Sequence, residues 1–140
     1  MKKLVILLSV LILMVLVFGA CSNSNNSVSA PVSSYSSADI KQIGTGDKEF
    51  VFEVVDDQGL QENFLVKTDK EFVGEALFEL GLIDGTQGAY GLYVKEVNGI
   101  TLDYEINQKY WAFYINGEYA TSGVDKTVVE NGCAYSFKAQ

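Results

Sequence analysis

The chain has 140 residues, with 10 Lys and Arg against 18 Asp and Glu, no histidine, and a formal net charge of −8 at pH 7. Such an acidic surface repels phosphate backbones, so we expect no nucleic-acid partner. The lack of histidine excludes a Ser-His-Asp triad, a Cys-His pair and a histidine metal site, and we therefore expect neither an enzyme, nor a metal, nor a resident cofactor.

The N-terminal residues have the organisation of a bacterial export signal. Two lysines precede an apolar run at residues 4–18, which is shorter than the roughly 20 residues that a membrane-spanning helix needs. The segment at residues 17–21, VFGAC, resembles the lipobox of bacterial lipoproteins. The resemblance implies a signal peptide at residues 1–20, cleavage before Cys21 and lipid on the Cys21 sulfur. An uncleaved signal anchor and an ordinary secretory signal are the alternatives.

A lipid on Cys21 implies that the membrane is a partner and that the protein lies outside the cytoplasm. Lysine without arginine and many asparagines favour an AT-rich genome, and the surface of a Gram-positive cell is the simpler location. Residues 21–47 are mostly small and polar, contain the only proline, Pro31, and show no apolar periodicity. We predict a flexible tether there, with ordered structure from Lys48 onward.

Residues 48–140 form the predicted globular domain, which begins with a β-hairpin. Residues 49–55 alternate in polarity, residues 56–59 have turn composition, and residues 63–66 supply a return strand.

A helix is predicted next. Thr68 or Asp69 can cap its N-terminus, Glu71 suits the first turn, and Gly81 ends it. The apolar side chains at helical spacing that predict its buried face are Phe72, Val73, Ala76, Leu77 and Leu80. The segment that follows, up to residue 88, is predicted to be a loop.

The remainder of the chain predicts strands. Residues 90–97 and 100–104 form a second hairpin around an Asn-Gly turn, residues 110–115 form an aromatic strand that turns at Asn116, and residues 133–137 close the domain. This order predicts an α+β fold, a β-grasp-like mixed sheet with one covering helix. We expect the uncovered sheet face to carry alternate aromatic side chains and to bind a ligand or partner.

The segment at residues 109–119, KYWAFYINGEY, is the strongest candidate for a site. Strand alternation sends Trp111 and Phe113 to one face, and Tyr110 and Tyr114 to the other. Tyrosine joins an apolar ring to a polar tip, as contact surfaces require. The candidate ligand-binding residues are Tyr110, Trp111, Tyr114, Asn116 and Tyr119. The alternative is that these aromatic residues are part of a core.

The remaining acidic residues and Cys133 could in principle act in catalysis or metal binding, but we interpret them as structural. Asp56 and Asp57 are adjacent acids in a turn, and the glutamates at 71, 75 and 79 mark an exposed helix face. Cys133 has no cysteine partner once Cys21 carries lipid, and we expect a buried, inert thiol.

The aromatic segment, together with residues 72–77, 93–99 and 128–137, resembles the transcobalamin-like C-terminal domain, which bacterial surface proteins carry under the label DUF4430. The resemblance spans residues 48–140, and its most specific elements are V-N-G, Y-W-x-x-Y-x-N-G and the final G-x-x-x-x-F. It implies a β-grasp-related ligand-binding fold with Tyr110 and Trp111 near the ligand. Animal vitamin B12 carriers have glutamine in place of Ala112 and an acidic residue in place of Cys133, and a helical domain completes their site.

The resemblance therefore implies a non-catalytic binding module for a small soluble ligand, with a corrinoid such as cobalamin as the leading candidate and a membrane transporter as a partner. The alternative is a cell-surface adhesion or assembly module that binds a cell-envelope protein or glycan through its aromatic sheet face.

Overall fold

The computed structural model describes residues 40–140. The predicted signal peptide, Cys21 and the predicted tether up to residue 39 lie outside this range. Within it, none of the helices has the length and apolar character needed to cross a membrane. The elements are β1 (Ile40–Gly44), β2 (Lys48–Val55), β3 (Gln61–Thr68), α2 (Val73–Glu79), β4 (Ile83–Gly88), β5 (Gly91–Val97), β6 (Ile100–Thr101), α3 (Tyr104–Asn107), β7 (Trp111–Ile115), β8 (Glu118–Tyr119), the 3-10 helix η1 (Val124–Lys126) and β9 (Ala134–Ala139).

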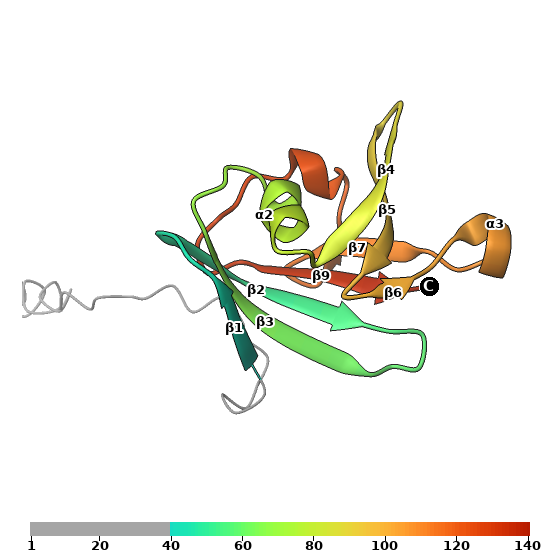
Figure 1. Ribbon diagram of the computed structural model, residues 1–140, viewed down its shortest axis with the longest axis horizontal. Helices are drawn as coiled ribbons and strands as arrows, with labels where there is room; N and C mark the ends of the chain where they lie inside the picture. Colours follow the sequence, from blue (N-terminus) through green and yellow to red (C-terminus); the bar gives the residue numbers. More distant parts are fainter. Residues whose placement is uncertain (1–39) are drawn as a thin grey trace, which may run out of the picture.

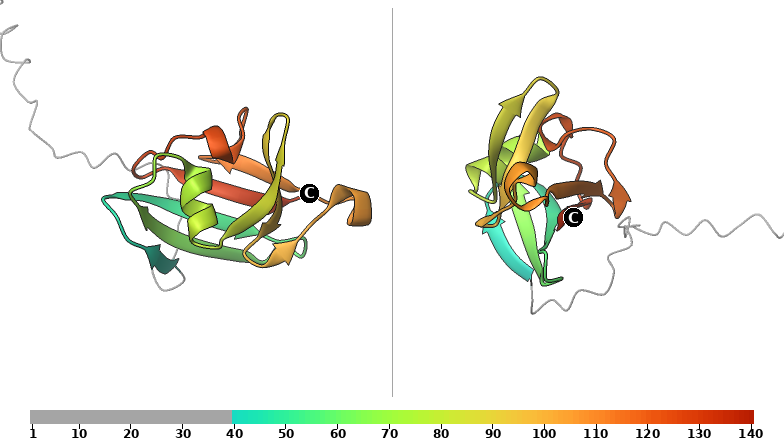
Figure 2. Two further views of the ribbon diagram at one scale, coloured as in Figure 1. Left: turned by 45° about the horizontal axis from the view of Figure 1, so that its top comes forward. Right: turned by 90° about the vertical axis from the view of Figure 1, so that its right-hand side faces the viewer.

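A mixed six-stranded sheet in the order β1-β3-β2-β9-β7-β8 forms the body of the domain. The pairs β1–β3 and β2–β9 are parallel, whereas β2–β3, β7–β9 and β7–β8 are antiparallel. Helix α2 and a second sheet, in the order β4-β5-β6, lie over the same face of the large sheet (Figures 1 and 2). The predicted α+β class with a mixed sheet and one main helix is confirmed.

The core consists of alternate side chains from the central strands and the inner face of α2. In β2, Phe50, Phe52 and Val54 are buried, because every second side chain of a strand points to the covered face. The ring of Phe50 meets that of Tyr135 edge-on, with centroids 5.1 Å apart. The rings of Phe113 and Phe137, on neighbouring strands, have centroids 5.0 Å apart. Strands from both halves of the chain therefore share one aromatic core.

The predicted first hairpin is confirmed. Strands β2 and β3 pair with Val55 opposite Gln61. The Asp56 side chain stabilises the connection, since its Oδ1 accepts hydrogen bonds from the backbone amides of Gln58 and Leu60, both at 2.8 Å. The role of Asp56 as a turn residue follows from these bonds.

The predicted tether is wrong for residues 40–47. Strand β1 lies there and pairs in parallel with β3, with Ile40 opposite Asn63. Of its side chains, Ile43 shares the face of the buried Val66, while Lys41 and Gln42 are exposed. An edge strand needs only a little apolar surface, and this one shows no alternating pattern that would identify it.

The predicted start of the helix is also wrong. Helix α2 begins at Val73, and its N-cap residue, Phe72, makes no capping side-chain bond. Thr68 still belongs to β3, and the Asp69 carboxylate accepts instead from the backbone amide of Asp47 at 2.9 Å. The backbone before the helix is hydrogen-bonded to a distant segment. The backbone oxygen of residue 71 accepts from the amide of residue 129, and the amide of residue 73 donates to the backbone oxygen of residue 127, both at 2.8 Å.

Two further elements differ from prediction. Residues 83–88, expected to be a loop, form β4 and pair with β5, although Ile83 is the only apolar side chain among them. The expected strand at residues 100–104 ends at Thr101. Asp103 then caps α3, where its side chain accepts from the backbone amide of Glu105 at 3.0 Å. The Asx-type cap stabilises a helical turn in place of further strand.

Tyr135 of β9 joins the core to the segment before it. Its hydroxyl accepts from the backbone amide of Glu130 and donates to the backbone oxygen of Val128, both at 3.1 Å. Burial of the ring raises the pKa of Tyr135 from 10.0 to about 12.

We predict that the free energy of unfolding falls as the pH rises from 10.0 toward about 12, because the unfolded chain releases the Tyr135 proton at a pH where the folded protein retains it. Urea unfolding at a series of alkaline pH values measures this fall. Tyr135→Phe has no proton to release and should lack this component. Equal slopes for the two proteins would contradict the prediction.

Candidate functional site

A cleft of about 260 Å³ lies between the small sheet and the inner side of β7. Leu92 and Tyr93 of β5 form one wall, and Trp111 and Phe113 of β7 form the floor. The segment at residues 119–124, which leads from β8 to η1, closes the other side. The lining is therefore rich in aromatic side chains from three separate parts of the chain.

The cleft exists because β8 is too short to cover β7. Strand β8 pairs only with Tyr114 and Ile115, and one further bond runs from the backbone amide of Ala120 to the oxygen of Phe113 at 2.9 Å. The chain then leaves the sheet, and the first half of β7 borders the cleft. Asn116 at φ 50° and Gly117 at φ 84° give the tight turn that allows this short hairpin.

Trp111 forms the buried base of the cleft. Its side chain is 6% exposed, and its indole Nε1 donates to the backbone oxygen of Ile100 at 3.2 Å. This bond satisfies the only polar atom of the ring and fixes its orientation between β7 and β6. Trp111 is therefore largely a core residue, one edge of which borders the cleft.

Three exposed tyrosines are among the residues that line the cleft. Tyr93, Tyr110 and Tyr119 line the cleft and are 43%, 37% and 62% exposed. The phenylalanines Phe113 and Phe137, which also border it, are buried beneath them. Aromatic rings with polar tips thus lie at the surface and purely apolar rings lie in the core, an arrangement suited to a ligand with apolar and polar parts.

Tyr114 and Asn116 lie outside the cleft. Tyr114 is opposite Ser136 on the other sheet face, where its ring meets Tyr119 edge-on at 5.4 Å and lies 5.5 Å from the Lys138 ammonium. Asn116 holds the turn to the last strand, since its Oδ1 accepts from the backbone amide of Ala134 at 2.9 Å. Of the five candidate residues, the structure brings together Tyr110, Trp111 and Tyr119. Their binding of a ligand stays a prediction.

The cleft lies on the inner side of β7, whereas the sequence predicts a ligand surface on the uncovered face. Sequence reasoning also missed Tyr93 and the segment at residues 119–124 as lining groups. The motif at residues 93–99 contains Tyr93, but no local pattern shows that the small sheet places it beside β7. Cys133, predicted to be buried, is half-buried, and its thiol lies 3.6 Å from the Glu130 carboxylate.

An ion pair supports the wall that carries Tyr93. Lys95 Nζ lies 2.7 Å from Asp103 Oδ2 and 5.7 Å from the centre of the Tyr93 ring. The hydrogen bond from Lys95 and, to a smaller extent, the bond from the Glu105 amide lower the pKa of Asp103 below 3.8. The same contact with Asp103 raises the pKa of Lys95 above 10.5. The pair links β5 to Asp103, the N-cap residue of α3.

Residues 40–140 hold no group of three or more His, Cys, Asp and Glu side chains placed to bind a metal ion. Asp125 Oδ1 is buried without a hydrogen-bond partner, but a single carboxylate does not make a site.

Comparisons with known proteins agree with the fold. The model of the family described as "Domain of unknown function (DUF4430)" matches residues 57–138. A crystal structure at 1.30 Å of a "putative metal binding protein" from Ruminococcus gnavus ATCC 29149 has 29% identity and a TM-score of 0.64, over 67% of this chain and 97% of that one. Haptocorrin in complex with Cbi has 17% identity and a TM-score of 0.50, over 70% of this chain and 26% of its own, and shows the fold alone. No curated protein matches the sequence.

We predict that the Lys95–Asp103 pair stabilises the domain above pH 3.8 and loses this contribution as the pH falls further, because the folded state holds Asp103 ionised at a pH where the unfolded chain takes up a proton. Denaturant unfolding between neutral and acid pH measures the loss. Asp103→Asn keeps an acceptor for the Glu105 amide but cannot titrate, so its stability should depend less on pH in this range. An unchanged pH dependence in Asp103→Asn would contradict the assignment.

Proposed function

Since the chain belongs to the DUF4430 family, we propose that its domain is a non-catalytic module that binds a small soluble ligand in the cleft between β5 and β7. The observation that carries this proposal is that three exposed tyrosines, Tyr93, Tyr110 and Tyr119, border a cleft that also contains the buried Trp111. These rings offer apolar area and hydroxyl groups at a small cost in side-chain entropy.

The size of the cleft limits what it can hold. Small-molecule sites typically enclose about 300–1,000 Å³ and bury most of the ligand. At about 260 Å³, this cleft accommodates a very small molecule or one edge of a larger one. A ligand bound by its edge makes few contacts, and we expect modest affinity unless a partner covers the rest.

A corrinoid is the first ligand to test. Haptocorrin, which is described in complex with Cbi, shares the fold of this chain. A corrin ring is broad and carries amide groups on its rim, so its edge suits tyrosine rings with hydroxyl tips. The motif residues Tyr110 and Trp111, which the resemblance to the transcobalamin-like domain places near the ligand, both line the cleft.

The proposal includes a membrane tether. Lipid on Cys21 would hold the domain outside the cytoplasmic membrane, where it could pass ligand to a transporter. Support comes from the sequence at residues 17–21 and from the apolar run before it.

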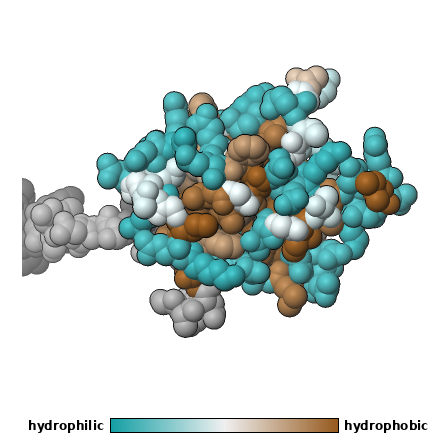
Figure 3. Space-filling model, viewed as in Figure 1, coloured by the Kyte–Doolittle hydropathy of each residue, from teal (hydrophilic) through white to brown (hydrophobic). Residues whose placement is uncertain are grey.

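A protein or glycan partner is the second candidate, and a specific observation favours it. Tyr90, between β4 and β5, and Ile106 of α3 are almost fully exposed. The β4–β5 hairpin and α3 both project from the body of the domain, and an apolar group stands among hydrophilic atoms over α3 (Figures 1 and 3). Such projecting side chains suit contact with a larger partner. The sequence favours the aromatic sheet face for this role, but Tyr114 on that face is half-buried.

We expect cobalamin or cobinamide to quench the fluorescence of Trp111 in a saturable manner, because Trp111 is the only tryptophan and lies at the base of the cleft. The titration uses the full-length protein in a mild detergent, with an inert absorber to correct for light taken up by the corrin ring. Tyr110→Ala and Tyr119→Ala should each weaken binding roughly tenfold, or about 1.4 kcal/mol.

Tyr104→Ala is the matched control, because Tyr104 is an exposed tyrosine that does not line the cleft. It should bind as the wild type does. Equal weakening in all three variants would show that the cleft is not the site. A flat titration of the wild type would reject a corrinoid ligand and favour the protein or glycan partner.

We also expect cells that express the protein to attach an alkyne-tagged fatty acid to it, with loss of the label in Cys21→Ser. Cys133→Ser, which changes the only other cysteine, should keep the label. Label retained in Cys21→Ser would refute lipid attachment at this residue.

A further inference from the structure

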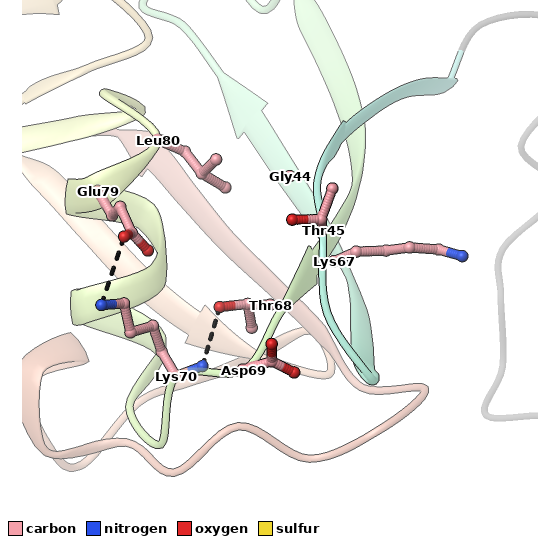
Figure 4. Close-up of a pocket in the computed structure, with 8 residues that line it drawn as sticks. All are labelled: Gly44, Thr45, Lys67, Thr68, Asp69, Lys70, Glu79 and Leu80. Carbon is pink, nitrogen blue, oxygen red and sulfur yellow. Dashed lines mark hydrogen bonds and ion pairs between the residues drawn. The ribbon is translucent and has the colours of Figure 1, made fainter.

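A second hollow, of about 530 Å³, lies between the C-terminal end of α2 and the ends of β1 and β3 (Figure 4). It shares no lining residue with the aromatic cleft. Its volume falls within the range of roughly 300–1,000 Å³ that small-molecule sites occupy. The hollow is therefore large enough to hold a whole small molecule.

One wall depends on two glycines that flank Thr45. A Cβ on Gly44 would lie 2.3 Å from the backbone oxygen of Lys67, and a Cβ on Gly46 would lie 2.2 Å from the backbone carbon of Thr68. The turn after β1 can thus pack directly against the end of β3 only with glycine at both positions. This close packing places Thr45 at the edge of the hollow.

Hydroxyl groups and one apolar side chain face the interior. Thr68 is buried, and its Oγ1 accepts from the backbone amide of Lys70 at 3.1 Å, which leaves the hydroxyl proton free to be donated. In Figure 4 the Thr45 hydroxyl and the Leu80 side chain point toward each other across the gap. A bound molecule would meet hydrogen-bonding groups on one side and an apolar surface on the other.

Charges of both signs complete the lining. Lys70 Nζ lies 3.4 Å from Glu79 Oε1, and both side chains are exposed, so this pair contributes little to stability and can open at small cost. Asp69 Oδ1 accepts from the amide of Asp47, which leaves Oδ2 available. The Lys67 side chain points away from the hollow in Figure 4. The polar groups inside are therefore one ammonium, two carboxylates and two hydroxyls.

We propose that this hollow binds a small zwitterion of the amino-acid type. The ligand carboxylate accepts hydrogen bonds from Lys70 Nζ and the Thr68 hydroxyl, and the ligand ammonium donates to Glu79. Each charged group of the ligand then meets groups of opposite sign, and the Lys70–Glu79 contact is exchanged for two contacts with the ligand. This site is separate from the cleft and does not depend on the function proposed for it.

The test is a titration of full-length ¹⁵N-labelled protein, in a mild detergent, with glycine and L-alanine, followed by NMR. We expect saturable shifts of the backbone amides of Thr45, Thr68 and Lys70, with no shift of the Trp111 indole. Acetate and methylamine each carry one of the two charged groups and should bind at least about tenfold more weakly. Equal binding of acetate or methylamine would overturn the zwitterion assignment, as would the absence of saturable shifts at millimolar glycine and L-alanine.

Substitutions that remove charge without removing bulk locate the site. Glu79→Gln removes the charge that the ligand ammonium meets and should weaken binding about tenfold. Glu75→Gln is the matched control, an exposed acid of the same helix that does not line the hollow. Wild-type affinity in Glu79→Gln would overturn the proposal.

Discussion

The insertion of β9 between β2 and β7 is the constraint on which the rest of the domain depends. On one side β9 runs parallel to β2, with Phe52 opposite Tyr135, and on the other it runs antiparallel to β7, with Phe113 opposite Phe137. The rings of Phe52 and Phe137 lie 6.2 Å apart and connect the two halves of the core. Without β9, the first hairpin and the aromatic strand would share no backbone contact.

The position of the cleft follows from this arrangement. The start of β7 is fixed by a pair of backbone bonds between Tyr110 and Gln140, at 3.0 and 3.1 Å, while the opposite edge of that half of β7 is left open by the short β8. A rigid strand with one open edge therefore supports exposed tyrosines beside buried rings. The same sheet forms one wall of the second hollow at its far end, where β1 and β3 finish. The two candidate sites therefore lie toward opposite edges of the sheet, one beside β7 and β8 and the other beside β1 and β3.

The sequence predicts those elements whose pattern is local. The hairpin of β2 and β3, the Asn116 turn and the inward direction of Trp111 and Phe113 all follow from alternation and turn chemistry. Strands β1 and β4 are not predicted, because they have few apolar residues and are defined by their partners. The sequence mispredicts the start of α2 for a related reason, since backbone hydrogen bonds to residues 127 and 129 take the place of a side-chain cap. Tyr110, Trp111 and Tyr119 can be chosen from sequence, whereas Tyr93 joins them only through the packing of two sheets.

The central place of β9 has a consequence for biosynthesis. It is the last strand of the chain to be synthesised among those described, yet it occupies the middle of the sheet. Until it is available, the edge of β2 that will receive it exposes unpaired backbone groups beside apolar side chains, which is a surface prone to aggregation. The six-stranded sheet therefore cannot be completed until β9 has been synthesised.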